Sequence, residues 1–339
     1  MDWPLKRIDI AIYSGCNLRC KHCYQADLKN SEICLSYEKI KDVLLNCKDL
    51  GAYELTITGG EPLLHPNFFR ILNLANKLGY KKIVFTNGTL IDENTANNFE
   101  NYNVEAVQIS LDGPRDIHDW IRGEGTFEKV LQGITLLVNR DINVIVNTQL
   151  TGNLLNHIAE WIKFLESLGI SEVRFTITAL LGDAKKNRVM TPMSYIERLR
   201  ELLTIDIEQR KFCKNLSKCG ALINNLAINY DGNVYPCEFF RSLAHYSLGN
   251  IYHETLEQIY LSWIQSESSL LRYFIEGVKE CEECEFKSVC HRCPARIYST
   301  YKSFEHPDPL YCILFGKREL PKGFDLSKLA YGSRVQYLK

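Results

Sequence analysis

The sequence has no excess of charge of either sign, no long apolar run and no export signal. Its 40 Lys and Arg residues balance 41 Asp and Glu residues, so nothing global attracts it to nucleic acid or to an anionic membrane. No apolar stretch approaches the roughly 20 residues that a membrane helix needs. The first apolar stretch is interrupted by Lys6, Arg7 and Asp9 and is unlike a signal peptide. We therefore expect a cytoplasmic protein that binds neither nucleic acid nor membrane.

Cysteine is present in unusual number. The chain has 13 cysteines among 339 residues. In a short secreted protein they would indicate disulfides, but this chain is long and lacks an export signal. Clustered cysteines in such a protein are more often metal ligands or redox groups, and their spacing decides which.

Short runs rich in β-branched residues alternate with stretches of helical spacing. The runs cover residues 7–13, 54–58, 82–86, 106–111, 143–149 and 172–178. Alternating strands and helices predict an α/β fold with a parallel sheet, because parallel neighbours need a crossover connection. Right-handed crossovers in chain order would curl that sheet into a partial (β/α)6 barrel of the TIM type. A doubly wound sheet stays open as the alternative.

Local signals mark where helices begin and end. Leu35-Ser36 and His65-Pro66 are typical of helix starts, and Gly51, Gly79 and Gly169 follow expected helix ends. In the first of these helices, Ile40, Leu44 and Cys47 fall on one face, which makes Cys47 a core residue. Cys34 has no evident role.

The alternation stops near residue 206 and cysteines take its place. We expect residues 1–205 to form the barrel domain and residues 206–320 a small, loop-rich domain. The apolar content of the second domain is thin, so metal centres are expected to hold it together. Residues 321–339 are expected to form a tail packed on the surface.

Three cysteines follow the first expected strand closely. Cys16, Cys20 and Cys23 form a CxxxCxxC loop, which can hold three irons of a 4Fe–4S cube and leave the fourth iron without a protein ligand. A structural zinc site is the alternative, but zinc requires four ligands and His22 is poorly placed to be the fourth.

The segment Tyr13-Ser14-Gly15-Cys16-Asn17-Leu18-Arg19-Cys20-Lys21-His22-Cys23-Tyr24 resembles the signature of the radical S-adenosylmethionine (SAM) superfamily. Further motifs of that family follow in order at the ends of the next strands: Gly59-Gly60-Glu61-Pro62, Thr86-Asn87-Gly88, Ser110-Leu111-Asp112-Gly113 and Arg122-Gly123. Parallel α/β folds bind their ligands at the carboxyl ends of strands. The resemblance implies that the chain is a radical SAM enzyme.

The resemblance also implies roles for single residues. Cys16, Cys20 and Cys23 would ligate the cluster, and the amino and carboxylate groups of SAM would chelate its open iron. The remaining SAM contacts would come from the backbone and carboxylate around Gly59, Gly60 and Glu61 for the ammonium, Ser110 and Arg122 for the carboxylate and ribose side, Tyr24 for the adenine, and Asn87 and Asp112 at the strand ends. For Arg122 a surface ion pair with Asp119 or Glu124 is the alternative.

Eight further cysteines lie beyond residue 206. Their spacing resembles the SPASM domain, which extends radical SAM enzymes that mature peptides and proteins. By that resemblance Cys213, Cys219, Cys237 and Cys293 would hold one auxiliary 4Fe–4S cluster, and Cys281, Cys284, Cys290 and Cys312 a second. The family usually has three residues between its last two close cysteines, whereas two separate Cys290 from Cys293 here. From these cysteines alone, two zinc knuckles are nearly as good an interpretation.

The expected cofactors are therefore three 4Fe–4S clusters and SAM. SAM would be cleaved reductively to a 5′-deoxyadenosyl radical that abstracts hydrogen from a substrate, with a low-potential donor such as flavodoxin or ferredoxin supplying the electron. Glu238 follows Cys237 where the anaerobic sulfatase-maturing enzymes carry an aspartate thought to take a proton. Our hypothesis is that Glu238 is a general base. A solvated or ion-paired carboxylate is the alternative.

The resemblance favours a peptide or protein substrate, modified by thioether or carbon–carbon crosslinking, epimerisation or oxidation, as in the maturation of ribosomal peptides. Because the first expected strand begins soon after Trp3, a separate leader-peptide-binding protein or direct recognition in the cleft would be required. Sulfatase maturation and modification of a tetrapyrrole side chain are the alternative activities. A zinc-stabilised binding protein without catalysis is the alternative outside enzymes.

Overall fold

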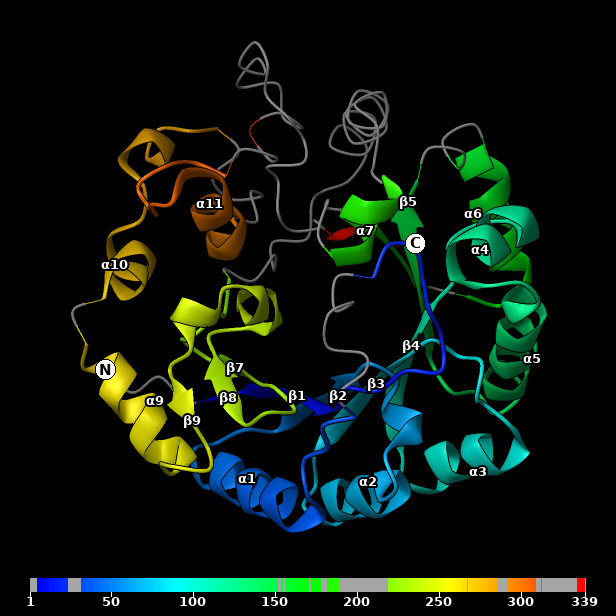
Figure 1. Cartoon of the computed structure of the whole chain (residues 1–339), viewed down its shortest axis with the longest axis horizontal. Helices are drawn as coiled ribbons and strands as arrows, with labels where there is room; N and C mark the ends of the chain where they lie inside the picture. Colours follow the sequence, from blue (N-terminus) through cyan, green and yellow to red (C-terminus); the bar gives the residue numbers. More distant parts are fainter. Residues whose placement is uncertain are drawn as a thin grey trace.

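The computed structural model describes residues 5–23, 32–151, 154, 157–170, 172–177, 182–189, 219–266, 268–285, 292–308, 312 and 334–338. Within these residues the strands form one sheet in the order β10-β6-β5-β4-β3-β2-β1-β7-β8-β9. Figure 1 shows this sheet curved into an arc, with helices α1 to α6 along its outer side.

The bounds of the elements are as follows. The strands are β1 (Arg7–Tyr13), β2 (Glu54–Gly59), β3 (Lys81–Thr86), β4 (Val104–Ser110), β5 (Val144–Leu150), β6 (Glu172–Ile177), β7 (Asn225–Ile228), β8 (Asn233–Tyr235), β9 (Gly249–Asn250) and β10 (Arg334–Leu338). The α-helices are α1 (Tyr37–Asp49), α2 (Phe68–Lys77), α3 (Glu93–Asn101), α4 (Arg115–Arg122), α5 (Thr126–Val138), α6 (Ile158–Ser167), α7 (Gly182–Asn187), α9 (Leu256–Ile264), α10 (Ser269–Glu276) and α11 (Pro294–Tyr301). Short 3-10 turns are η2 (Pro62–Leu64), η4 (Glu238–Ser242), η5 (Ala244–Tyr246) and η6 (Lys279–Cys281).

Strands β1 to β6 confirm the predicted parallel sheet. Each pairs in parallel with the next strand along the chain. A doubly wound sheet would reverse its strand order part-way, and this consecutive order excludes that alternative. The fold is therefore α/β, with the curled parallel sheet of a partial TIM barrel.

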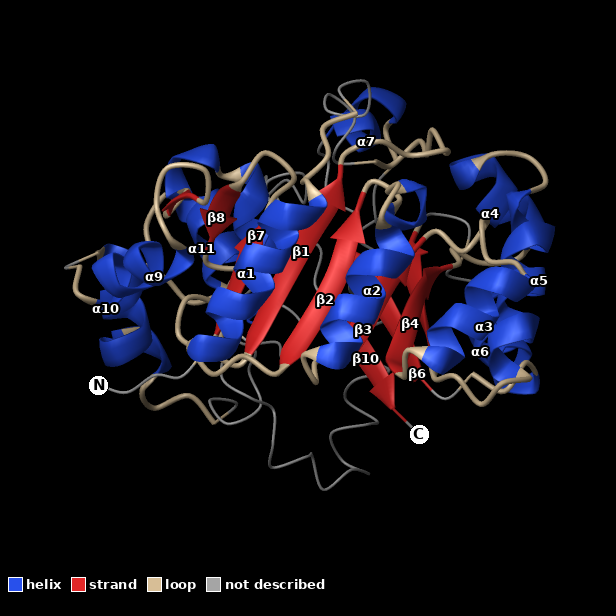
Figure 2. Ribbon diagram, turned by 90° about the horizontal axis from the view of Figure 1, so that it is seen from below, coloured by secondary structure: helices blue, strands red, loops and turns tan. Residues whose placement is uncertain are grey.

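The two faces of the sheet differ in polarity. Ile8, Ile10 and Ile12 on β1 are buried in the hydrophobic core, and Figure 2 shows α1 and α2 lying across the same part of the sheet. Successive side chains of a strand point to opposite faces, so Asp9 points to the concave side, where it too is buried. The helices therefore cover an apolar face, and polar groups gather inside the arc.

Helix α1 begins and ends where its sequence predicts. The Ser36 side chain accepts a hydrogen bond of 3.2 Å from the Lys39 N–H, which satisfies a backbone donor of the first turn. After the helix, Gly51 has a φ of +96°, a conformation that favours glycine. Helix α2 begins at Phe68, two residues after the expected start at His65-Pro66. Just before the helix, the His65 side chain accepts a hydrogen bond of 3.1 Å from the Asn67 N–H.

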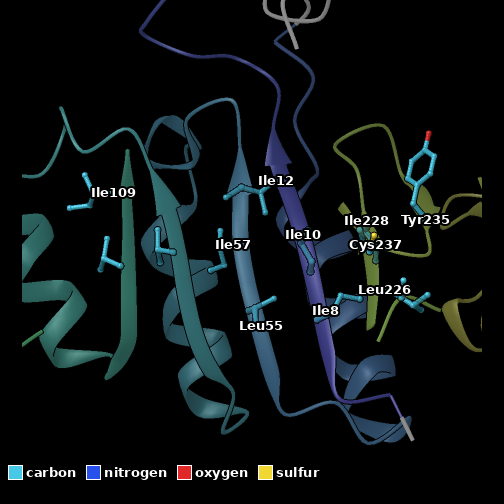
Figure 3. Close-up of a cluster of buried hydrophobic side chains, with 14 of the residues drawn as sticks. Ile8, Ile10, Ile12, Leu55, Ile57, Ile109, Leu226, Ile228, Tyr235 and Cys237 are labelled. Carbon is cyan, nitrogen blue, oxygen red and sulfur yellow. The ribbon is translucent and has the colours of Figure 1, made fainter. Parts of the chain in front are cut away.

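The cysteine-rich part continues the main sheet instead of forming a separate small core. Strand β7 pairs in parallel with β1, and β8 and β9 add antiparallel strands beyond it. In Figure 3 the apolar side chains of β1 and β2 continue into Leu226 and Ile228 of β7 and reach Cys237. Periodicity could not show that β7 shares the barrel's core. The expectation that metal centres hold this part together stays a prediction.

The end of the described chain also joins the sheet. Strand β10 pairs antiparallel with β6, with Val335 opposite Phe175. The sequence-based expectation was a tail packed on the surface, and the expected boundary at residues 205 and 206 lies outside the described residues. Among the helices that the structure describes, none has both the length and the apolar character needed to cross a bilayer.

Candidate SAM and iron–sulfur sites

The three-cysteine loop lies directly after β1 and is held from two sides. The Lys21 N–H donates to the carbonyl of Ile121 in α4 at 2.8 Å. From the other side, the Asp183 N–H in α7 donates to the Cys23 carbonyl at 2.9 Å, and the Asn187 side chain donates to the Lys21 carbonyl at 2.9 Å. The cysteines are thus fixed at the carboxyl end of the strands, where a parallel sheet places its ligands.

The glycine pair after β2 allows the backbone to approach this loop closely. Gly59 has a φ of +155°, and a Cβ there would lie 2.3 Å from the Tyr13 carbonyl oxygen. A Cβ on Gly60 would lie 2.4 Å from the Gly15 carbonyl oxygen. The Gly60 N–H donates to Tyr13 O at 2.8 Å and the Glu61 N–H to Gly15 O at 2.9 Å. Only glycine at these two positions therefore lets the end of β2 pack directly against the backbone of the cysteine loop.

The Glu61 carboxylate is fully buried and ties β2 to β3. It accepts hydrogen bonds from Thr86 Oγ1 at 2.7 Å, from the Asn87 N–H at 2.8 Å and from the Leu63 N–H at 3.2 Å. Burial raises the pKa of Glu61 to about 7, although these donors act in the opposite direction. The contact of the SAM ammonium with the backbone and carboxylate around Gly59, Gly60 and Glu61 stays a prediction.

Asn87 connects the end of β3 to the first cysteine. Its Nδ2 lies 3.9 Å from Cys16 Sγ and donates to Asn17 Oδ1 at 2.8 Å. Its Oδ1 accepts from Thr89 Oγ1 at 2.6 Å, and Asn17 Nδ2 in turn donates to that hydroxyl at 2.9 Å. Burial raises the pKa of Cys16 to about 11, while the Leu18 N–H lowers it. Asn87 thus lies against the cysteine loop.

Asp112 and Arg122 form a buried ion pair beside the second cysteine. Arg122 Nε donates to Asp112 Oδ2 at 2.6 Å, and its Nη1 lies 3.8 Å from Cys20 Sγ. Its Nη2 lies 3.4 Å from His22 Nε2. Burial alone would raise the pKa of Asp112, but the Arg122 cation lowers it. Because Arg122 is buried with Asp112, the surface ion pair with Asp119 or Glu124 is not formed.

His118 is a member of this site that the sequence reading did not single out. It is fully buried in α4, and its Nδ1 accepts a hydrogen bond of 3.1 Å from the Asp112 N–H. Burial lowers its pKa to about 4, so the ring is neutral near pH 7. His118 and Arg122 lie four residues apart on one helix, and that spacing would have placed them on the same face.

Ser110 ends β4 on the concave side of the sheet. In the parallel ladder with β5 it lies opposite Asn147, whose Oδ1 accepts from Thr176 Oγ1 of β6 at 2.8 Å. Most of the predicted SAM-contacting residues thus lie at the ends of β2, β3 and β4 or just beyond them: Gly59, Gly60, Glu61, Asn87, Ser110 and Asp112. Arg122, the last residue of α4, joins them through its ion pair with Asp112. Tyr24 lies outside the described residues.

Two groups of cysteines lie together in the cysteine-rich part. Burial, followed by the charge of Cys293, raises the pKa of Cys219 to about 12. Burial, Cys219 and Cys293 together raise the pKa of Cys237 well above its usual value. Separately, burial raises the pKa of Cys281, and Cys284 adds to the shift. The two ligand sets expected from the sequence stay predictions, and two of their members, Cys213 and Cys290, lie outside the described residues.

The chemistry of these donor sets fits iron–sulfur clusters. Thiols that are buried beside one another raise one another's pKa, and a bound cationic cluster relieves that penalty by stabilising the thiolates. Among the described residues, no three His, Cys, Asp or Glu side chains surround a point as the ligands of a single ion do. In a cube, by contrast, each thiolate binds a different iron.

Glu238 begins η4 directly after Cys237 and lies near the charged groups of the concave face. The pKa of Arg7 is raised chiefly by Asp9 and further by Glu238. Three residues after Glu238, Arg241 Nη2 donates to the carbonyls of Asp9 and Ile228 at 3.2 and 3.3 Å. A carboxylate is thus placed beside the first auxiliary cysteine group, on the inner side of β1.

Comparison with known proteins agrees with this arrangement. Residues 10–168 match the radical SAM superfamily, and residues 219–294 match SPASM, an iron–sulfur cluster-binding domain. The chain is a radical SAM enzyme with a SPASM domain. SAM and iron–sulfur clusters are accordingly its cofactors.

This radical SAM enzyme is similar along most of its length to proteins of differing activity. It is 25% identical to an AdoMet-dependent heme synthase of Methanosarcina barkeri, over 88% of this chain and 94% of that protein. It is 27% identical to a cysteine-type anaerobic sulfatase-maturating enzyme of Clostridium perfringens, over 86% and 90%. It is 29% identical to the subtilosin biosynthesis protein AlbA of Bacillus subtilis, over 82% and 64%.

Solved structures share the fold. The structure of native anSMEcpe with bound AdoMet and Cp18Cys peptide superimposes with a TM-score of 0.72 at 23% identity. The superposition covers 93% of this chain and 95% of that one. At this identity the likeness establishes the fold alone.

Proposed function

We propose that this radical SAM enzyme abstracts hydrogen from a peptide or protein side chain and thereby installs a post-translational modification. One observation carries the proposal. The three-cysteine loop is fixed on the glycine pair of β2, and the same sheet carries, through β7, the cysteine groups of a SPASM domain. Two relatives support the substrate class, one named for the biosynthesis of the bacteriocin subtilosin and one for the maturation of sulfatases.

The first cluster would be held by Cys16, Cys20 and Cys23. When bound there with SAM, it would supply the electron that cleaves SAM to methionine and a 5′-deoxyadenosyl radical able to abstract hydrogen. The backbone of Gly59 and Gly60, with Ser110 at the end of β4, would orient SAM. Arg122, held by Asp112, would present its positive charge to the cluster side of that site.

Two auxiliary 4Fe–4S clusters complete the proposal. Cys213, Cys219, Cys237 and Cys293 would hold one, and Cys281, Cys284, Cys290 and Cys312 the other. With all ligands supplied by the protein, neither would bind substrate directly, and both would serve electron transfer. A low-potential donor such as flavodoxin or ferredoxin would supply electrons to the enzyme, which we place in the cytoplasm.

The test is an anaerobic assay with SAM, dithionite and the reconstituted protein. We expect 5′-deoxyadenosine from the intact chain and none from a Cys16→Ala, Cys20→Ala, Cys23→Ala variant. Metal analysis should find about twelve irons and as much sulfide per chain. An iron-loaded protein that leaves SAM intact would refute the proposal. A protein that contains zinc in place of iron would refute it in favour of a zinc-stabilised binding protein.

Glu238 would act as the general base that removes a proton from the substrate radical. Its place directly after Cys237, near Arg7 on the concave side of β1, supports this role. Glu238→Gln should abolish the modified product while SAM cleavage persists. The matched control is Glu257→Gln, an exposed carboxylate in the first turn of α9. Unchanged product with Glu238→Gln would show that the carboxylate is only ion-paired.

Two other activities remain candidates, each supported by a relative. The sulfatase-maturating relative, together with Glu238 after Cys237, favours oxidation of a sulfatase side chain to formylglycine. The heme synthase relative favours a tetrapyrrole substrate. Binding of a haem-like pigment, measured by absorbance titration, would support the tetrapyrrole. Product formation from a short cysteine-containing sulfatase peptide would support sulfatase maturation. Product formation from a ribosomal precursor peptide, with or without a leader-binding partner, would support peptide maturation.

A further inference from the structure

A buried ion pair lies in the cysteine-rich part. Arg296 of α11 and Asp308 are each only 1% exposed, and Arg296 Nε donates to Asp308 Oδ1 at 2.8 Å. Arg296 Nη2 donates to the other carboxylate oxygen. Burying both charges costs desolvation free energy that the attraction only about offsets, and apolar residues of similar size are often as stable. Stability alone therefore does not account for this pair.

Asp308 contacts one cysteine from each auxiliary group. Its Oδ2 accepts a hydrogen bond of 2.8 Å from the Cys293 N–H. Its backbone carbonyl accepts a hydrogen bond of 3.1 Å from the Cys312 N–H. Cys293 belongs to the group with Cys219 and Cys237, whereas Cys312 is expected to ligate the second cluster with Cys281. A single residue thus lies between the two ligand sets.

Arg296 completes the contact on the side of the first set. The Arg296 charge acts on both Cys293 and Cys219. Its guanidinium can approach these sulfurs only in the orientation that Asp308 imposes, because both carboxylate oxygens hold it in a fixed plane. Groups that hold metal ligands from behind in this way commonly change metal affinity by about 10- to 100-fold when they are removed.

We propose that Asp308 is a positioning residue that fixes the ligand loops of the two auxiliary clusters to each other. Its carboxylate holds Arg296 and the backbone of Cys293, and its carbonyl holds the backbone of Cys312. The inference rests on the proposed assignment of two auxiliary clusters. It goes beyond that assignment by making assembly of the two clusters interdependent.

The test counts auxiliary iron alone. A background variant with Cys16→Ala, Cys20→Ala and Cys23→Ala cannot hold the SAM cluster and should retain about eight irons per chain. In this background Asp308→Ala should leave fewer than about four irons, because both clusters lose a positioned ligand. Asp231→Asn is the matched control, since that carboxylate accepts hydrogen bonds from Asn233 in the β7–β8 turn, and it should retain all the iron.

A second variant keeps the test decisive if Asp308→Ala does not fold, as judged by far-ultraviolet circular dichroism. Asp308→Asn preserves shape and one acceptor but cannot neutralise Arg296. It should release iron to an excess of a ferrous chelator about tenfold faster than the control. The absorbance and paramagnetic signals of both clusters should fall together.

Other results would overturn the proposal. Loss of about four irons would show that Asp308 serves one cluster only. Equal release rates for Asp308→Asn and Asp231→Asn would show that it positions neither. A background variant that binds no iron at all would remove the two-cluster assignment, and the inference with it, whereas formation of 5′-deoxyadenosine by the intact chain would test the SAM chemistry separately.

Discussion

Two buried carboxylates at the SAM site show how local partners set protonation. Burial is the largest single influence on the pKa of Asp112 and raises it, but the Arg122 guanidinium at 2.6 Å, together with His22 and His118, lowers that pKa overall. Glu61 receives only neutral donors from Leu63, Thr86 and Asn87. Burial consequently dominates, and the pKa of Glu61 rises to about 7. With a cation at contact distance, the buried Asp112 is ionised near pH 7. Glu61, whose hydrogen-bond donors are neutral, is partly protonated at that pH.

This difference predicts a pH dependence of stability. The folded chain binds a proton at Glu61 up to pH about 7, whereas an unfolded glutamate releases it near pH about 4.3. Between these values the folded state binds more protons, so the free energy of unfolding should decrease by roughly 3 kcal/mol as the pH rises from about 4.3 to about 7. Urea titrations of the metal-free chain at several pH values would measure this slope.

Glu61→Gln should remove that contribution to the slope, because an amide does not titrate in this range. Its overall stability should also be lower, since an amide cannot accept from all of the present donors. The control is Glu38→Gln, an exposed side chain of α1, which should leave the slope unchanged. A slope as steep in Glu61→Gln as in the unsubstituted chain would show that another group titrates.

Motifs in the sequence predicted which residues form the site but not the contacts between them. Gly59, Gly60, Asn87, Asp112 and Arg122 were found because they belong to recognised motifs, but the motifs do not give their contacts. The geometry of the ion pair of Asp112 with Arg122 depends on how the turn after β4 meets the end of α4. His118 lies in no motif, and only the folded helix places it under Asp112.

Among the elements, the end of β2 and the cysteine loop form one unit. A Cβ on Gly59 would lie 2.3 Å from backbone, which cannot rotate away as a flexible side chain can. Gly59→Ala should therefore displace the loop and abolish iron binding at Cys16, Cys20 and Cys23, besides destabilising the fold by roughly 2 kcal/mol or more. Iron content and thermal unfolding of the reconstituted chain would measure both effects.

The matched control is Gly79→Ala after α2. Gly79 also has a positive φ, +71°, but an added Cβ would meet nothing within 4 Å. It should cost about 1 kcal/mol from backbone strain alone and keep the full iron content. Equal iron loss in both variants would mean that general destabilisation, and not the clash with the loop, removes the cluster.

Element positions were the most predictable part of the molecule. The six strands of the barrel lie within two residues of the predicted runs, because β-branched runs and turn residues act locally. The pairing of β7 with β1 and of β10 with β6 was not predictable, since partner choice between distant strands leaves no periodic signal.

At the scale of the whole molecule, a single hydrophobic core connects the barrel to the cysteine-rich part. Ile228 of β7 is fully buried in that core beside the side chains of β1. The two parts should therefore unfold together, because apolar surface shared between them cannot be exposed on one side only. Binding of the auxiliary clusters would then stabilise the barrel as well.

Ile228→Ala should lower the free energy of unfolding by about 2–5 kcal/mol and leave one transition. Leu261→Ala on α9 is the control, because this side chain is 43% exposed and its removal should have little effect. Thermal unfolding of the metal-free chain, followed by circular dichroism and by tryptophan fluorescence, would show whether the transitions coincide. Two separate transitions would mean that the shared core does not couple the parts.

The pairing of β1 with β7 also fixes a distance along the sheet. Arg7 pairs with Asn225 and Ile10 with Ile228, so the register of the two strands is fixed along this stretch. From Asp9, near the Glu238 side, to Tyr13, where the cysteine loop begins, is about 13 Å at the usual rise per residue. This spacing between the Glu238 side and the cysteine loop does not depend on the length of the surrounding loops. It would change only if β1 and β7 shifted in register, and a shift of one residue would turn Ile8, Ile10 and Ile12 away from the core.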